Sequence, residues 1–181
     1  ARTEPVLEPC GYVFLAHSAA RRKGLAADVA LQNELGIPSE LLEPEDVAER
    51  VDAGTRVVAF SGVQSATGHR SDIAAISGLA REAGAIVFVD GSQLVGALPV
   101  ADELRHVDVL VTPDHKFLLN AGRGMGYCYL SPAAQARFTP VNAGWRAGSV
   151  PLDSFFGPEM NLSDTASRFD NSISWLAAIG N

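Results

Sequence analysis

The chain is poor in several residues and patterns on which whole classes of proteins depend. Only two of its 181 residues are cysteines, Cys10 and Cys128, which excludes a disulfide scaffold. Neither the cysteines nor the four histidines show the spacing of a zinc site. No apolar run reaches the roughly 18 residues that span a bilayer, and the first residues lack the pattern of a signal peptide. We therefore expect a cytoplasmic protein that has no membrane span and no bound metal.

Positive charge is also scarce. The chain has 14 basic and 21 acidic residues, a net charge of -7 and a pI near 5.0, which argues against nucleic acid or an anionic membrane as its partner. The only lysines are Lys23 and Lys116, so chemistry that needs a lysine amine has two candidates. No G-x-S-x-G motif is present, which argues against a serine hydrolase. With 47% hydrophobic and 19% charged residues, the composition is that of a folded domain with a sizeable core.

What the chain does contain is an alternation of apolar runs and amphipathic stretches. We expect helices over residues 25–35, 44–51 and 72–83, and strands over 11–16, 40–42, 55–60, 85–89, 107–111 and 126–130. In the third helix the apolar stripe comprises Ile73, Ile76, Leu79 and Ala80. Runs such as AIVFV have no polar residue, which is typical of parallel strands covered on both faces. The pattern predicts a three-layer α/β/α fold with a mainly parallel sheet.

The chain changes character beyond Ser131, where prolines and glycines become frequent. We interpret residues 1–140 as the core of a large domain and residues 141–181 as an irregular segment that leads toward a small C-terminal domain. A further helix is predicted over 172–179. The glycine-rich run 122–126 precedes a strand, so it predicts a tight turn rather than a nucleotide-binding loop, which would open a helix after a strand.

Three polar clusters follow predicted strands: residues 61–67 (SGVQSAT), 90–93 (DGSQ) and 112–116 (TPDHK). Ligands of parallel α/β sheets bind at the carboxyl ends of the strands, so we expect the three clusters to converge at one edge of the sheet. We therefore expect the ligand-binding and catalytic residues at this edge.

Lys116 and Asp90 are the residues of these clusters that are best suited to catalysis or cofactor binding. A partly desolvated lysine loses its proton more easily and can form a Schiff base with a carbonyl, although a lone loop lysine is more often simply solvated. A carboxylate at a sheet edge needs a partner, and the protonated ring nitrogen of a cofactor would serve as one. Asp90 could equally cap the turn that follows it. The amide of Gln93 could donate to an oxygen of the same ring.

Other candidates are assigned structural roles. Cys128 lies in the middle of the strand GYCYL and is expected to be a buried packing residue. Arg146, next to Trp145, could grip a substrate carboxylate, as could Arg70, but we favour ordinary pairing at the surface for both.

Together the clusters resemble a known family, the class V aminotransferase group of pyridoxal-phosphate enzymes with fold type I. This group includes cysteine desulfurases, isopenicillin N epimerase-like enzymes and kynureninase. The resemblance is strong over residues 57–130, which include DGSQ and the run VLVTPDHKFLLNAGRGMGYCYL, and weaker over 144–168. It implies the cofactor pyridoxal 5'-phosphate and an amino-acid substrate.

The resemblance also implies roles for individual residues. Lys116 matches the lysine that holds the cofactor as an internal aldimine and moves the α-proton, and Asp90 matches the acid that pairs with the pyridinium nitrogen. The remaining matches are to residues around the ring oxygen or the substrate (Gln93 and Gln64) and to contacts of the phosphate (His115, Thr112 and Ser172). In the family the hydroxyl at the position of Ser172 reaches the phosphate in the neighbouring subunit, which implies a homodimer with shared active sites.

The chain departs from the family pattern in several places. Pro113 stands where the family often has serine, which leaves Thr112 as the nearest hydroxyl, and Asn171-Ser172 replaces the common Gly-Thr. The ring-stacking residue is not assigned, because the best register places Arg21 or Arg22 there and His17 lies several residues away.

The reaction is left open by these residues. Transamination, β-elimination, C–S cleavage and epimerisation would use the same set, and we favour lyase or desulfurase-like chemistry. Members of the family are usually longer than this chain, which matches from before the second family strand to the entry of the small domain. The alternative hypothesis is a non-catalytic fragment, or half of a split protein, that binds a partner chain.

Overall fold

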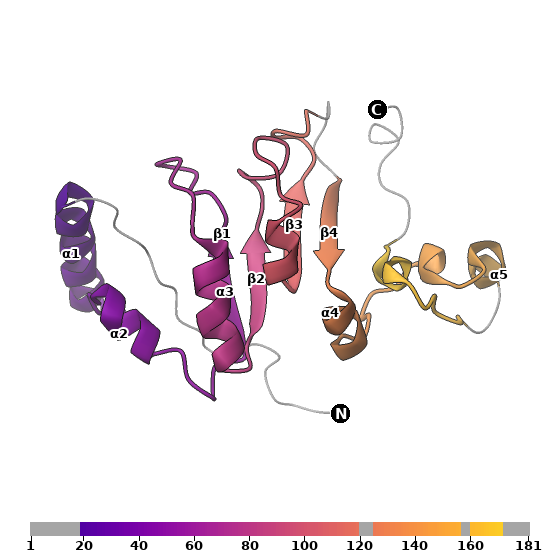
Figure 1. Cartoon of the computed structure of the whole chain (residues 1–181), viewed down its shortest axis with the longest axis horizontal. Coiled ribbons are helices and arrows are strands. Elements are labelled where there is room, and N and C mark those ends of the chain that lie inside the picture. The colour runs from indigo at the N-terminus through magenta and orange to yellow at the C-terminus, as the bar shows by residue number, and fades with distance from the viewer. Residues whose placement is uncertain (1–18, 120–124, 157–159, 172–181) are drawn as a thin grey trace. The chain divides into compact units, whose positions relative to one another are not determined.

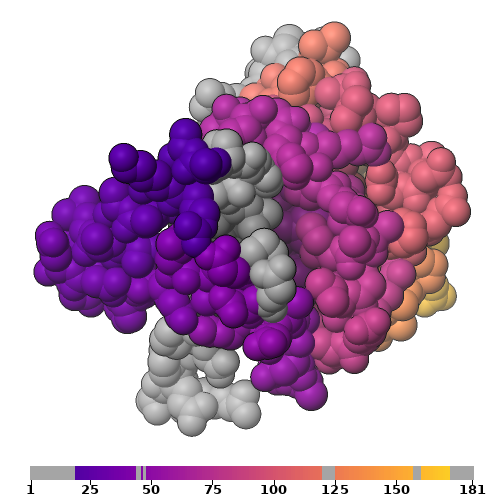
Figure 2. Space-filling model, turned by 60° about the vertical axis from the view of Figure 1, so that its left-hand side comes forward, coloured from indigo at the N-terminus to yellow at the C-terminus, as the bar shows by residue number. Residues whose placement is uncertain are grey.

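The computed structural model describes residues 19–119, 125–156 and 160–171 of the chain. The chain divides into two compact units, residues 1–49 and 50–181. In the space-filling view of Figure 2, indigo and violet mark the described part of the first unit, and purple to yellow mark the second. The boundary that we predicted near residue 140 stays a prediction.

The described part of the first unit is helical. Helix α1 spans Ala19–Glu34 and α2 spans Pro44–Glu49, and Arg22 of α1 forms an ion pair with Glu43. Both predicted helices are confirmed, although α1 begins six residues earlier than expected because Ala19 to Lys23 are good helix formers. The strand predicted over 40–42 is wrong: this stretch has no regular structure and pairs with no strand among the described residues.

The second unit is built on a four-stranded sheet (Figure 1). Its order is β1-β2-β3-β4, with β1, β2 and β3 parallel and β4 antiparallel to β3. The strands span Val57–Ser61 (β1), Ile86–Asp90 (β2), Val109–Pro113 (β3) and Gly126–Leu130 (β4). The predicted α/β class with a mainly parallel sheet is confirmed, and β3 lies two residues later than expected. The strand predicted over 11–16 lies outside the described residues.

Helix α3, Ile73–Glu82, connects β1 to β2 and packs on both strands; in Figure 1 it is seen in front of β1 and beside β2. The Asp72 carboxylate accepts a hydrogen bond from the Ala75 backbone N–H at 3.0 Å, and Gly84 follows the helix with φ +73°. Ile73 and Ala80 are buried against Val87 and Val89 of β2, which are both 0% exposed. The predicted helix and most of its stripe are confirmed, but Leu79 is 44% exposed.

The two faces of the sheet differ in their covering. Alternate residues such as Val87 and Val89 lie on the α3 face, whereas Val57, Ala59 and Cys128 lie on the opposite face and are exposed. The face opposite α3 is covered unevenly: Val109 of the inner strand β3 is 5% exposed there, whereas Val57 of the outer strand β1 is 50% exposed. An apolar run does not distinguish a strand with two covered faces from a strand with one.

The segment after β4 has more regular structure than expected. It contains helix α4 (Pro132–Arg137), helix α5 (Pro151–Phe156), and the 3-10 helices η2 (Trp145–Ala147) and η3 (Ala166–Phe169). A further 3-10 helix, η1 (Glu103–His106), precedes β3. At the amino end of β3, the Asp108 carboxylate accepts hydrogen bonds from the Val87 backbone N–H at 3.0 Å and the Ser131 hydroxyl at 3.2 Å, and so ties three stretches of chain together.

Candidate active site

Asp90 is the last residue of β2 and sits in register with Ser61 of β1 and Val111 of β3. Two backbone hydrogen bonds continue this register past the strand ends: Gly62 N–H donates to Asp90 O at 2.9 Å, and Gly91 N–H donates to Val111 O at 2.8 Å. The loops that follow β1, β2 and β3 therefore begin side by side at one edge of the sheet. The predicted convergence of the three polar clusters is confirmed.

The Asp90 carboxylate is half-buried and oriented by its own loop. Its Oδ1 accepts the backbone N–H of Ser92 at 2.8 Å, which is the turn-capping arrangement that the sequence left as one alternative. A carboxylate has further acceptor sites on its second oxygen. Capping the turn and holding a cationic ring nitrogen are therefore compatible roles for this side chain.

Lys116 follows β3 in a turn that begins inside the protein. Asp114 is only 1% exposed, and its backbone N–H donates to Met125 O at 3.3 Å. The His115 side chain is half-buried, with Nδ1 3.9 Å from Asp114 Oδ1. Lys116 is half-buried as well, and its carbonyl accepts the Leu119 N–H at 3.0 Å. The simple alternative of a fully solvated loop lysine is not what the structure shows.

Sequence reasoning overlooked the buried Asp114 beside this histidine. The available signal was its position between Pro113, the last residue of a buried strand, and His115. An acid at such a position is within the folded body of the protein rather than in a solvated loop.

Gln64 lies in a narrow loop that returns the chain from β1 to α3. Its backbone N–H donates to His69 O at 2.8 Å, its carbonyl accepts Gly68 N–H at 2.8 Å, and Val63 pairs with Arg70. The Gln64 side chain is half-buried, like that of Gln93 in the loop after β2. The structure thus places both glutamines in loops that leave the same edge as Asp90, and their roles toward a ligand stay predictions.

The two predicted phosphate contacts from hydroxyl side chains have different outcomes. Thr112 is 5% exposed and its hydroxyl donates to the Pro113 carbonyl at 3.3 Å, so this side chain already has a hydrogen-bond partner. Ser172 lies outside the described residues, as does His17. Arg21 and Arg22 both belong to α1 in the first unit and are exposed, and the ring-stacking residue remains unassigned.

A cavity of about 400 Å³ opens beside the Asp90 loop. One wall is Ser92, and the others come from β3 and from the start of β4: Val111, Thr112, Pro113, Met125, Gly126, Tyr127 and Cys128. The cavity therefore adjoins both the loop that carries Asp90 and the strand that leads to Lys116.

Cys128 corrects an expectation. We predicted a buried packing residue, but the side chain is exposed and lines this cavity. The reason is topological: β4 pairs only with β3 among the described residues, and Cys128 lies on the face opposite α3. Partial burial by neighbouring atoms nevertheless raises the pKa of the thiol above the usual cysteine value. A thiol that resists ionisation is a poor nucleophile at neutral pH.

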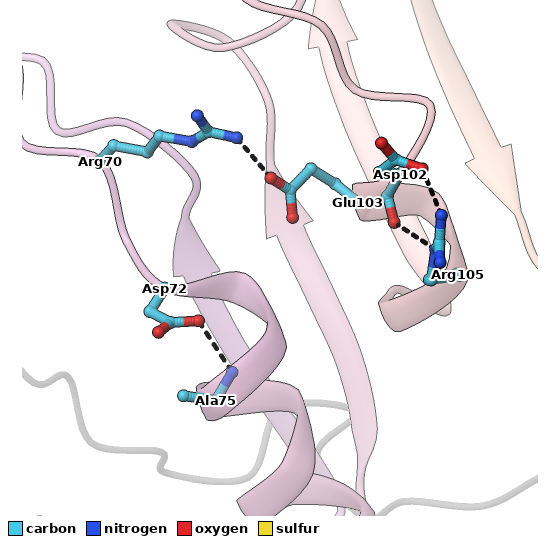
Figure 3. A network of polar contacts seen from close by, with 6 residues as sticks. All are labelled: Arg70, Asp72, Ala75, Asp102, Glu103 and Arg105. Atoms are coloured by element: carbon cyan, nitrogen blue, oxygen red, sulfur yellow. Dashed lines mark hydrogen bonds and ion pairs between the residues drawn. The ribbon is translucent and has the colours of Figure 1, made fainter.

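Arg70 and Arg146 form the surface contacts that we favoured. Figure 3 shows Arg70 in an ion pair with Glu103 of η1, beside the Asp72 cap of α3 and a second ion pair between Arg105 and Asp102. The Arg146 guanidinium carbon lies 5.4 Å from the centre of the Trp145 ring, and the Arg146 side chain is exposed.

The described residues fit pyridoxal phosphate in the chemistry of their donors. They offer a lysine amine and a carboxylate from loops that follow adjacent parallel strands. Nδ1 of His115 is buried and has no hydrogen-bond partner within the described residues. A buried polar atom normally has such a partner, and a polar atom of a ligand could supply it. The described ranges contain no cluster of three or more His, Cys, Asp or Glu residues able to hold a metal.

Comparison with solved structures identifies the class of fold. A cysteine desulfurase from Thermococcus onnurineus NA1 matches with a TM-score of 0.60 and 22% identity, over 87% of this chain and 40% of that one. The cysteine desulfurase CsdA from Escherichia coli matches with a TM-score of 0.57 and 22% identity, over 75% of this chain and 32% of that one. The fold is that of the pyridoxal-phosphate-dependent transferases, and the chain spans less than half the length of either structure.

The family follows from the sequence match. The family model for aminotransferase class-V matches residues 8–169, so the chain belongs to the class V aminotransferase family, whose members are pyridoxal-phosphate enzymes. The resemblance inferred from the DGSQ and TPDHK clusters is thereby confirmed. A search of curated proteins found no match. Among the described helices, none has both the length and the apolar character needed to cross a membrane.

Proposed function

We propose that the chain carries the core of a pyridoxal-phosphate-dependent active site that acts on an amino acid, with Lys116 as the residue that binds the cofactor covalently. The observation that carries this proposal is the shared edge of β2 and β3. Asp90 ends one strand, Lys116 follows the next, and the Gly91–Val111 hydrogen bond joins the start of the Asp90 loop to β3.

Each residue has a defined task in this proposal. Pyridoxal phosphate, when bound, supplies an aldehyde that a lysine amine can attack and a ring that withdraws electrons. The Asp90 carboxylate holds the proton on the ring nitrogen, and Lys116 Nζ takes a proton from the substrate Cα or returns it. Gln93 and Gln64 orient the ring or the substrate by hydrogen bonds, and His115 donates to the phosphate.

The reaction class that we propose is lyase or desulfurase-like, with transamination as the second candidate. The fold likeness to two cysteine desulfurases agrees with this choice but at 22% identity concerns the fold alone. The exposed Cys128 is not proposed as the sulfur carrier, because its raised pKa makes it a weak nucleophile. A homodimer with shared sites, a role for Ser172 and a cytoplasmic location remain proposals of the same kind.

The test uses the two lysines of the chain as a matched pair. The protein, expressed from its complete reading frame, is incubated with pyridoxal phosphate, reduced with borohydride and weighed intact, alongside Lys116→Ala and Lys23→Ala. We expect one pyridoxyl-phosphate group on the wild type and on Lys23→Ala, and none on Lys116→Ala. An adduct that persists in Lys116→Ala, or its absence from the wild type, would refute the assignment of Lys116.

A further inference from the structure

Gly96, six residues after Asp90, makes an unusually close approach to the turn that starts at Lys116. Its φ is +88°, in the left-handed region that favours glycine. A Cβ atom added at Gly96 would lie 2.5 Å from the carbonyl oxygen of Phe117, 2.6 Å from its carbonyl carbon and 3.0 Å from Leu118 N. All three atoms belong to one peptide unit of the main chain, which cannot rotate away as a side chain could.

The peptide that Gly96 touches is the middle of the Lys116 turn. Leu119 N–H donates to Lys116 O at 3.0 Å, so residues 116 to 119 form a closed four-residue turn. Leu119 has φ +59° and is 85% exposed, so its strained backbone is not compensated by burial of its side chain. The close approach of Gly96 falls on the peptide in the middle of this turn.

The same loop carries Asp90 at its start and Gly96 at its end. After Gly91 the chain winds tightly, with the N–H groups of Leu94 and Val95 both donating to Gly91 O at 2.9 Å. Leu94 is completely buried and anchors this loop in the core. The loop thus meets the β3 segment twice, through the Gly91–Val111 hydrogen bond at its base and through the Gly96 contact at its far end.

We propose that Gly96 is a positioning residue for Lys116: the absence of a side chain lets the Asp90 loop pack directly on the Lys116 turn and sets the place of Lys116 relative to Asp90. This proposal rests on the proposed function of Lys116. The atoms nearest to a Cβ at Gly96 are main-chain atoms of residues 117 and 118 and not side-chain atoms of Lys116, so its effect on chemistry is indirect.

Other glycines supply the control. Gly84 has a similar φ of +73°, but an added Cβ there would meet nothing within 4 Å. Gly62 and Gly91 have close neighbours, but these are side-chain atoms of residues such as Leu94 and Val95, which can shift. Among the described glycines, Gly96 alone combines a positive φ with contact to another stretch of main chain.

The experiment compares Gly96→Ala with Gly84→Ala in the protein expressed from its complete reading frame. Both variants carry the strain of a positive φ, and only the first carries the clash. Two quantities are measured: the rate at which borohydride traps pyridoxal phosphate on Lys116, and amide hydrogen exchange of residues 114–119 without the cofactor. Gly96→Asn and Gly84→Asn repeat the comparison with a residue that tolerates a positive φ better but carries the same Cβ, so that the effect of the clash is separated from the effect of backbone strain.

We expect both Gly84 variants to label Lys116 at the wild-type rate. The Gly96 variants should label on the order of 10- to 100-fold more slowly, because a shift of about 1 Å in a reactive group has effects of this size. Exchange over residues 114–119 should rise only in the Gly96 variants. Equal labelling rates or equal exchange in the two pairs would overturn the proposal. A wild type that is never labelled would instead refute the proposed function, and the exchange comparison would still report on the Gly96 contact.

Discussion

The two faces of the sheet are built from the same kinds of residues but have different surroundings. On the α3 face, Val87 and Val89 are fully buried, whereas Val57 on the other face is 50% exposed and Cys128 is open to a cavity. The α3 face carries the packing of the second unit, and α3, η1 and the loop after β2 all contribute to it. On the other face, the outer strands β1 and β4 are open at Val57 and Cys128, whereas Val109 of the inner strand β3 is buried.

The largest expected effect comes from replacing one valine on each face. Val87→Ala removes two fully buried methyl groups and should lower the free energy of unfolding by about 2–3 kcal/mol. Val57→Ala, on the neighbouring strand and the opposite face, should cost less than about 1 kcal/mol because half of its side chain is exposed. Urea unfolding measures both values. Equal losses would show that the Val57 face is covered in solution.

A smaller effect is expected from the ion pair that joins two elements on the α3 side, Arg70 and Glu103 (Figure 3). Their side chains are 49% and 19% exposed, so solvent screens the attraction and the pair should contribute less than about 1 kcal/mol. A double-mutant cycle with Arg70→Ala and Glu103→Ala isolates this coupling. A coupling of several kcal/mol would mean that the pair is more deeply desolvated than its exposure indicates.

The smallest effect on stability is expected on the open face, at Cys128. Cys128→Ser should leave the free energy of unfolding almost unchanged, because the side chain is exposed. The thiol should nevertheless differ from a free cysteine in its reactivity. Burial raises its pKa, so the thiolate forms only at higher pH and alkylation by iodoacetamide should rise at higher pH in the folded protein than in urea.

Replacing Cys10 by serine in both samples leaves Cys128 as the only thiol to be labelled in the alkylation measurement. Coincident pH profiles in the folded and unfolded protein would contradict the raised pKa.

The sequence predicted a helix or strand correctly where the residues of that element specify it by themselves. The stretch 72–83 has a capping Asp72, an apolar stripe and a terminal Gly84, and it forms the predicted helix with Asp72 and Ala83 as its caps. The run 126–130 forms a strand with the predicted bounds. The shared edge of the three polar clusters also followed from sequence, because the carboxyl ends of parallel strands must lie together.

The errors occurred where a residue's surroundings come from other parts of the chain. The stretch 40–42 has the composition of a strand but pairs with no strand among the described residues. Cys128 has the sequence context of a core residue, yet its exposure depends on which strands and helices lie beside β4. Asp114 was overlooked because its one sequence signal is its position directly after a buried strand, and its burial is completed by other parts of the chain.

The sequence by itself determined the alternation of strands and helices, the mainly parallel character of the sheet and the family that the clusters around Asp90 and Lys116 resemble. These properties follow from periodicity and motif, which are local. Only the tertiary structure decided which face of the sheet is covered, that Asp114 is buried beside His115, and that Gly96 touches the peptide between Phe117 and Leu118. Such contacts join residues that are distant in sequence or lie on different strands, so they exist only once the chain has folded.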